Sequence, residues 1–228
     1  MTATHTDPTT APHSDLVNLV ETAQQALAAG DLDTAREAYT AMTTSFPDEA
    51  VAHNNLGAFE MGVSNYAGAE AAFNSAAALM PGHGNCLFNL ALAQYRQEKL
   101  SAAAQNFALA HAADPQDAEI LNNLGACRYQ IGEQDQARRD VENALKLQPN
   151  YPSAVMNLSD MEFMAGRTDK AIAICQAYLD HNQDLGVTRQ LLTILDAAQS
   201  RANEVVDMAD TTAKAAAHAN DKAGAAAE

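Results

Sequence analysis

The sequence contains no tryptophan, and its phenylalanine and tyrosine residues together make up only 5% of 228 residues. Its hydrophobic share of 47% is therefore carried largely by small and aliphatic side chains, alanine and leucine above all. Small side chains allow helices to approach closely, so this composition predicts a core of tightly packed helices and not one built around large rings.

Basic residues are also scarce. The chain has 13 Lys and Arg against 29 Asp and Glu, a net charge of -16. Affinity for nucleic acid comes largely from Lys and Arg that neutralise phosphates, so the balance argues against nucleic acid and against anionic membranes as partners. Up to Tyr95 the only basic residue is Arg36, against ten acidic ones. We expect a neutral or basic protein partner, the alternative being that this surface serves solubility alone.

Cysteine is rare, and long apolar runs are missing. Cys86, Cys127 and Cys175 form no Cys-x-x-Cys pair and are expected to be small buried hydrophobes. No run of about 18 apolar residues exists to insert into a membrane. The first twelve residues have neither the basic flank nor the apolar centre of a secretory signal, so we expect a cytoplasmic protein.

The motifs of catalysis and metal binding are missing as well. No Gly-rich phosphate loop occurs, and no nucleophile, base and orienting group fall together. His53, His83 and His111 have no partner at the spacing of metal ligands. The sequence predicts a protein that is not an enzyme and has no cofactor and no metal.

What the sequence does contain is a repeat. The motif Asn122-Asn123-Leu124-Gly125 recurs every 34 residues as Asn-Leu followed by a small residue. A column of alanines and a column of prolines keep the same interval. These columns are Ala35, Ala69, Ala103, Ala137 and Ala171, and Pro47, Pro81, Pro115 and Pro149. A fixed period of this length indicates an array of about five helical hairpins.

This period and residue pattern resemble the tetratricopeptide repeat family, over roughly residues 14–183. The family's small residue in each first helix corresponds to the column Ala23, Gly57, Ala91, Gly125 and Ser159. The resemblance implies an all-α fold, a right-handed superhelical solenoid of about five helix-turn-helix repeats, with a C-terminal capping helix.

The same pattern divides the chain into four parts. We expect a flexible leader at 1–13, the repeat array at 14–183, a capping helix at 184–208 and an Ala-rich flexible tail at 209–228. Pro8 and Pro12 disfavour helix in the leader, and Ser14 and Asp15 can cap the first helix. First helices are expected near 50–62, 84–97, 118–131 and 152–165, and second helices near 65–80, 99–113, 133–147 and 167–182.

One column carries the functional hypothesis. The resemblance implies that the first helices line an inner, concave surface. In the sequence, the residue before each leucine of the 34-residue repeat is an asparagine: Asn55, Asn89, Asn123 and Asn157. A carboxamide both donates and accepts hydrogen bonds, so a ladder of them can hold the backbone of an extended peptide. Similar asparagine ladders occur in the repeat domain of O-linked N-acetylglucosamine transferases. The alternative is that these side chains bond neighbouring carbonyls or water.

Apolar side chains at helical spacing from the ladder are candidate anchors for the side chains of such a peptide. They are Phe88, Leu92, Tyr95, Tyr129, Met156 and Phe163. Each could instead pack between neighbouring first helices.

The sequence therefore favours a non-catalytic interaction protein, an adaptor, scaffold or chaperone that binds an extended segment of another protein. Two alternatives stay open. The chain could be a substrate-binding accessory module of a separate enzyme such as a protein glycosyltransferase. It could also be a self-assembling structural scaffold, a homo-oligomer in which one copy's end helix covers the first repeat of the next.

Overall fold

The computed structural model describes the chain at residues 11–182 and 185–225, with side chains at 15–182 and 188–209. Within those ranges every regular element is an α-helix. The chain divides into two compact units, Met1–Ile131 and Gly132–Glu228, and each is described by itself.

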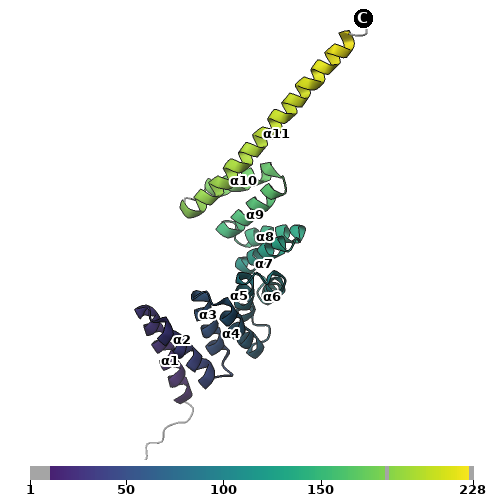
Figure 1. The fold of residues 1–228 in the computed structure, drawn as a ribbon. Coiled ribbons are helices and arrows are strands. Elements are labelled where there is room, and N and C mark those ends of the chain that lie inside the picture. The colour runs from purple at the N-terminus through teal and green to yellow at the C-terminus, as the bar shows by residue number, and fades with distance from the viewer. Residues whose placement is uncertain (1–10, 183–184, 226–228) are drawn as a thin grey trace, which may run out of the picture. The chain divides into compact units, whose positions relative to one another are not determined.

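The first unit is a stack of helical hairpins in which every helix contacts the next one along the chain (Figure 1). The first helices α3 and α5 also contact each other. The helices are α1 (Ala11–Ala29), α2 (Leu32–Ser45), α3 (Ala50–Gly62), α4 (Tyr66–Leu79), α5 (Gly84–Arg96), α6 (Leu100–Ala113) and α7 (Ala118–Gln130).

The second unit contains one complete hairpin, with a helix before it and a long helix after it. Its helices are α8 (Gln134–Leu147), α9 (Pro152–Met164), α10 (Thr168–Leu179) and α11 (Leu185–Ala225). The long helix α11 packs against both α10 and α9. Leu191 of α11 is fully buried in a cluster with Val155, Cys175 and Tyr178, so α11 covers the apolar side of the last hairpin.

The periodic columns of small and apolar residues form the core. The alanines at 35, 69, 103, 137 and 171 are all fully buried. The apolar column that begins with Tyr39 and continues through Phe73, Phe107, Val141 and Cys175 is buried as well. Small side chains let paired helices approach: a Cβ added to Gly57 would lie 2.5 Å from Cε1 of Phe73.

The turn inside each hairpin has one position with a left-handed backbone, and it recurs every 34 residues. It is glycine at Gly30, Gly132 and Gly166, where φ is +75°, +89° and +76°. Ser64 and Glu98 occupy the same position with φ of 61° and 59°. Side chains other than glycine are strained there, so these two repeats keep the turn because the packing of their hairpins holds it.

The helix bounds agree with those predicted from the sequence to within about three residues. Asp31 accepts a hydrogen bond from the Thr34 amide at 3.0 Å, as a capping residue does. Two helix ends differ from the expected ones. Helix α1 begins at Ala11 and not at Ser14, and it contains Pro12, which is tolerated because the first amides of a helix have no partner within it.

At the other end α11 continues as one helix to Ala225, past the boundary predicted at 208. Alanine has the highest helix propensity, so this segment forms helix without an apolar stripe to dock it. The flexible leader lies almost wholly outside the described residues, and the four-part division of the chain stays a prediction.

Candidate interaction surface

The asparagine ladder lies on the first helices, one residue before the leucine column. Leu90, Leu124 and Leu158 are buried, whereas the preceding asparagines at 89, 123 and 157 are only half-buried. The helical repeat places each asparagine about 100° around the axis from its leucine, which explains the difference. Asn55 and Leu56 of α3 are both half-buried.

Asn89 and Asn123 of the ladder form hydrogen bonds within the chain. Asn89 Nδ2 donates to Asn54 Oδ1 at 2.9 Å and so joins α5 to α3. Asn123 Nδ2 donates to the Glu119 carbonyl, one turn earlier in α7, at 2.9 Å. Each of these bonds uses one of the two N–H donors of a carboxamide and leaves its oxygen to accept from another group. Asn157 lies on α9 in the second unit.

The predicted apolar anchors take part in packing. Phe88 packs edge-on against Phe107 with their ring centroids 5.6 Å apart, and Leu92 and Tyr95 lie against the same cluster. The Tyr95 hydroxyl accepts a hydrogen bond from Gln130 Nε2 at 2.8 Å, which links α5 to α7.

The remaining anchors are half-buried: Tyr129 on α7, and Met156 and Phe163 on α9. Met156 lies against the cluster around Tyr178. The Arg201 guanidinium of α11 lies over the Phe163 ring at 5.6 Å. Their role in binding stays a prediction.

A buried polar column, not predicted from the sequence, runs near the end of the first helices. Glu60 accepts hydrogen bonds from Arg36 Nε and Nη2 of α2, at 2.9 and 3.2 Å, and from Asn65 Nδ2 at 2.9 Å. One repeat later Gln94 donates to Glu70 of α4 at 3.2 Å. The bonds of Glu60 with Arg36 and of Gln94 with Glu70 tie the second and third hairpins to the preceding ones, and buried polar groups need such partners.

Hydrogen bonding sets the ionisation of these carboxyls. The Arg36 guanidinium holds the pKa of Glu60 below its ordinary value. Burial acts to raise the pKa of Glu70, but hydrogen bonds from Lys99, Gln97 and Gln94 outweigh it and lower that pKa overall. Both carboxylates are therefore charged, paired parts of the scaffold at neutral pH.

The three cysteines are free and buried, as predicted. Burial raises the pKa of the Cys127 thiol to about 12, so it stays protonated at neutral pH. In the described part of the chain no three His, Cys, Asp or Glu side chains are grouped to hold a metal ion. No helix there combines the length and hydropathy that crossing a membrane requires.

The first unit contains a pocket of about 370 Å³ that the sequence analysis missed. It is lined by α1, α2 and α3, and the ladder residue Asn55 forms part of its wall. Its sequence signal is a pair of small residues on α3, Ala58 and Gly62, where the next repeat has Leu92 and Arg96.

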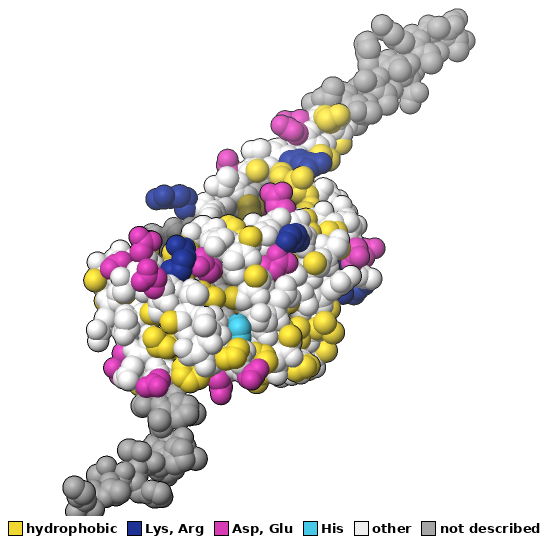
Figure 2. Space-filling model, turned by 60° about the horizontal axis from the view of Figure 1, so that its bottom comes forward, with side chains coloured by type: hydrophobic (Ala, Val, Ile, Leu, Met, Phe, Trp, Pro, Cys, Tyr) yellow, Lys and Arg dark blue, Asp and Glu magenta, His cyan; other side chains and the backbone are white. Residues whose placement is uncertain are grey.

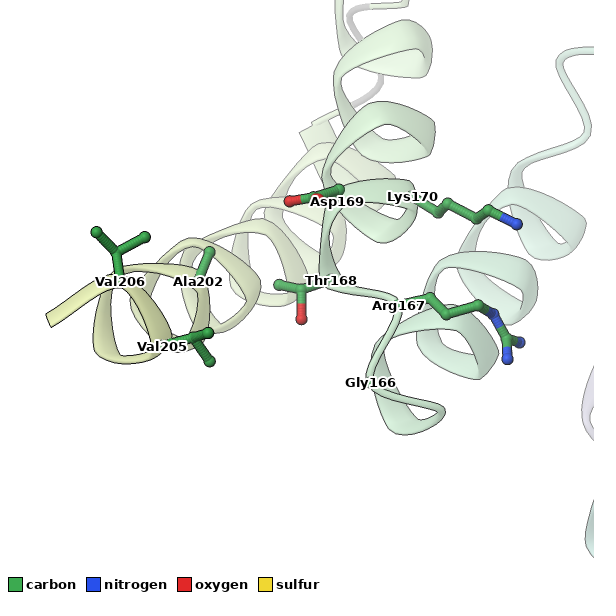
Figure 3. A pocket seen from close by; sticks show the side chains of 8 residues that line it. All are labelled: Gly166, Arg167, Thr168, Asp169, Lys170, Ala202, Val205 and Val206. Carbon is green, nitrogen blue, oxygen red and sulfur yellow. The ribbon is translucent and has the colours of Figure 1, made fainter. Parts of the chain in front are cut away.

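The second unit has a hollow of about 480 Å³ between the start of α10 and α11 (Figure 3). Thr168 and Asp169 line it from α10, and Val205 and Val206 line it from α11. Arg167 and Lys170 extend to the side away from α11 in that view. Arg167 bonds to Glu162, so its charge is paired within the hairpin.

These features define a helical repeat protein whose first helices carry a column of half-buried asparagines, one of which, Asn55, lines an apolar pocket. The chain belongs to the tetratricopeptide repeat family: the family's model matches residues 20–83, 60–118 and 128–184. Proteins of this family are typically non-catalytic modules for protein-protein interaction.

One known protein resembles part of this chain in sequence. A peroxisomal targeting signal receptor from Yarrowia lipolytica is 37% identical over 81 residues. The aligned segment is 36% of this chain and 14% of the receptor, so the chain corresponds to a small part of that relative.

Solved structures match most of the fold. MamA from Desulfovibrio magneticus RS-1, from residue 41 to its end, has a TM-score of 0.68 at 15% identity, over 73% of this chain and 94% of the other. The pilF protein of Pseudomonas aeruginosa has a TM-score of 0.67 at 18% identity, over 84% of this chain and 87% of the other. YrrB, described as a repeat protein with an unusual peptide-binding site, has a TM-score of 0.65 at 18% identity, over 81% of this chain and 97% of the other. At these identities the likeness concerns the fold alone.

Proposed function

We propose that this chain is a non-catalytic scaffold or adaptor that binds an extended segment of another protein through its asparagine ladder. The observation that carries the proposal is the half-exposed state of one asparagine in each of four successive first helices, in a single 34-residue register. An extended peptide offers an N–H and a C=O at regular intervals, which suits the carboxamides of Asn55, Asn89 and Asn123 on successive first helices of the first unit.

The internal bonds of the ladder are compatible with this role. Asn89 is oriented by Asn54, and Asn123 is oriented by the Glu119 carbonyl. A side chain that is already held in one orientation loses less conformational freedom when a ligand binds. The relative and the neighbours lend general support, because one is a receptor for a targeting signal and another has a peptide-binding site.

The test is a double substitution within the first unit, Asn89→Ala with Asn123→Ala. Each hydrogen bond contributes about 0.5–1.5 kcal/mol net, so affinity for a bound peptide should fall about tenfold or more while the helical circular dichroism stays unchanged. The matched control is Asn74→Ala with Asn143→Ala, at exposed positions of second helices. Equal affinity of the ladder variant and the unaltered protein would show that the asparagines serve only the scaffold.

A further inference from the structure

The pocket of the first unit is open because two side chains are small. Ala58 and Gly62 lie on its α3 wall, and the corresponding positions of α5 hold Leu92 and Arg96. A Cβ added to Gly62 would meet no atom within 4 Å. The opening is thus a property of this repeat. Its other lining residues include Leu27, Leu32, Tyr39, Asn55 and Phe59.

The lining is mostly apolar and partly exposed to solvent. Leu27 and Leu32, which lie before and after a hairpin turn, have high relative exposures for leucine, 40% and 47%. Tyr39 and Phe59 form the floor, with ring centroids 5.3 Å apart, and both are buried. A volume of about 370 Å³ is at the lower end of ligand pockets, which suits one or two apolar side chains.

The part of the sequence that forms this pocket is predominantly acidic. Of the residues up to Tyr95 only Arg36 is basic. Its guanidinium is bound by Glu60 at 2.9 Å and lies over the Phe59 ring at 5.2 Å, so its charge is compensated within the wall. Asp31 and Asp33 flank Leu32 at the rim and are exposed. The face shown in Figure 2 carries both acidic and basic side chains, with patches of hydrophobic side chains between them.

We propose that this pocket receives an apolar side chain of a Lys- or Arg-bearing segment, so that the partner is a basic peptide with one hydrophobic anchor. The inference rests on the proposed function, because Asn55 belongs both to the ladder and to the pocket wall. The apolar floor accounts for the anchor, and the excess of exposed carboxylates accounts for the basic flanks.

The experiment selects peptides from a displayed library of random dodecapeptides on the full chain. We expect enrichment of Leu, Met, Ile or Phe at one position with Lys or Arg around it, and an affinity that weakens as salt rises. Filling the pocket with Ala58→Leu and Gly62→Met should weaken the selected peptide about tenfold or more. The control is Ala71→Leu with Ala112→Met, at exposed positions of second helices, and it should leave affinity unchanged.

The outcomes separate this inference from the proposed function. Peptides that depend on Asn89 and Asn123 but show no anchor, and that bind the filled variant normally, would overturn the inference and leave the proposed function standing. Basic peptides with an apolar anchor whose affinity is unchanged by the ladder substitutions would support the inference and overturn the proposed function. Dimerisation that the filled variant abolishes would assign the pocket to a second copy and overturn the inference. A selection that enriches no peptide would overturn both.

Discussion

At the scale of single residues, Gly57 allows α3 and α4 to approach closely because it has no Cβ atom. Gly57 faces the Phe73 ring, where a methyl group would lie 2.5 Å from Cε1 and 2.6 Å from Cδ1. Both atoms belong to a side chain that is itself only 2% exposed, so the ring has little room to move.

Gly57→Ala should therefore lower the free energy of unfolding by about 1–3 kcal/mol, through overpacking. The same substitution at Gly62 meets open space and should be neutral or stabilising by up to about 1 kcal/mol. Urea denaturation of the two variants, followed by circular dichroism, measures both. Similar losses for the two glycines would contradict the described packing of α3 on α4.

The bond between Glu60 and Arg36 makes stability depend on pH. Arg36 holds the pKa of Glu60 below its ordinary value, so the folded state binds a proton there less readily than the unfolded chain. The resulting stabilisation is complete above the unfolded pKa of about 4.3 and is lost as pH falls through the depressed folded pKa.

Glu60→Gln should lower stability at neutral pH and flatten the fall in stability below about pH 4.3, because that titration is gone. Denaturation curves at a series of pH values measure the slope. Glu119→Gln, at an exposed position of α7, provides the control. An unchanged acid slope in the Glu60 variant would exclude this carboxyl as a source of the pH dependence.

At the scale of elements, α11 ends the array by covering the last hairpin. Leu191 is fully buried against Tyr178, Cys175 and Val155, whereas its neighbour Leu192 is 49% exposed. An array of repeats needs such an end-piece, because its last apolar edge would otherwise face water.

The pair of adjacent leucines provides a matched test of that cap. Leu191→Ala should destabilise the second unit by about 2–5 kcal/mol and promote association through its exposed edge. Leu192→Ala removes the same atoms from a solvated position and should cost far less. Urea unfolding and analytical ultracentrifugation measure the two effects. A cap is contradicted if the two variants behave alike.

The sequence predicted the hairpins well because each is bounded by residues with strong local preferences. Pro47, Pro81 and Pro115 follow second helices, and Asp31 begins one. The extent of α11 was missed because its last residues rely on alanine propensity and lack the apolar period used to find helices. The bond between Asn54 and Asn89 was missed because it depends on side-chain geometry between two helices.

At the scale of the whole molecule, the candidate binding surfaces depend on which side chains each repeat carries at equivalent positions. The register of the ladder is visible in the sequence because four asparagines share it, and its role in binding stays a prediction. The pocket could not be predicted, because it depends on the small size of Ala58 and Gly62 and appears only when α1, α2 and α3 are assembled. The uneven charge of the chain lies on the same first repeats as that pocket.

The most direct test of the central claim is a thermodynamic cycle between the ladder and a peptide backbone. A peptide selected on the chain is resynthesised with one amide at a time replaced by an ester, which removes a single N–H. Each ester is titrated by calorimetry against the unaltered protein, Asn89→Ala and Asn123→Ala. We predict that one ester position couples to each asparagine by about 0.5–1.5 kcal/mol, because ester and alanine remove the same hydrogen bond. Additive losses at every position would contradict the claim that the asparagines hold the backbone of a bound partner.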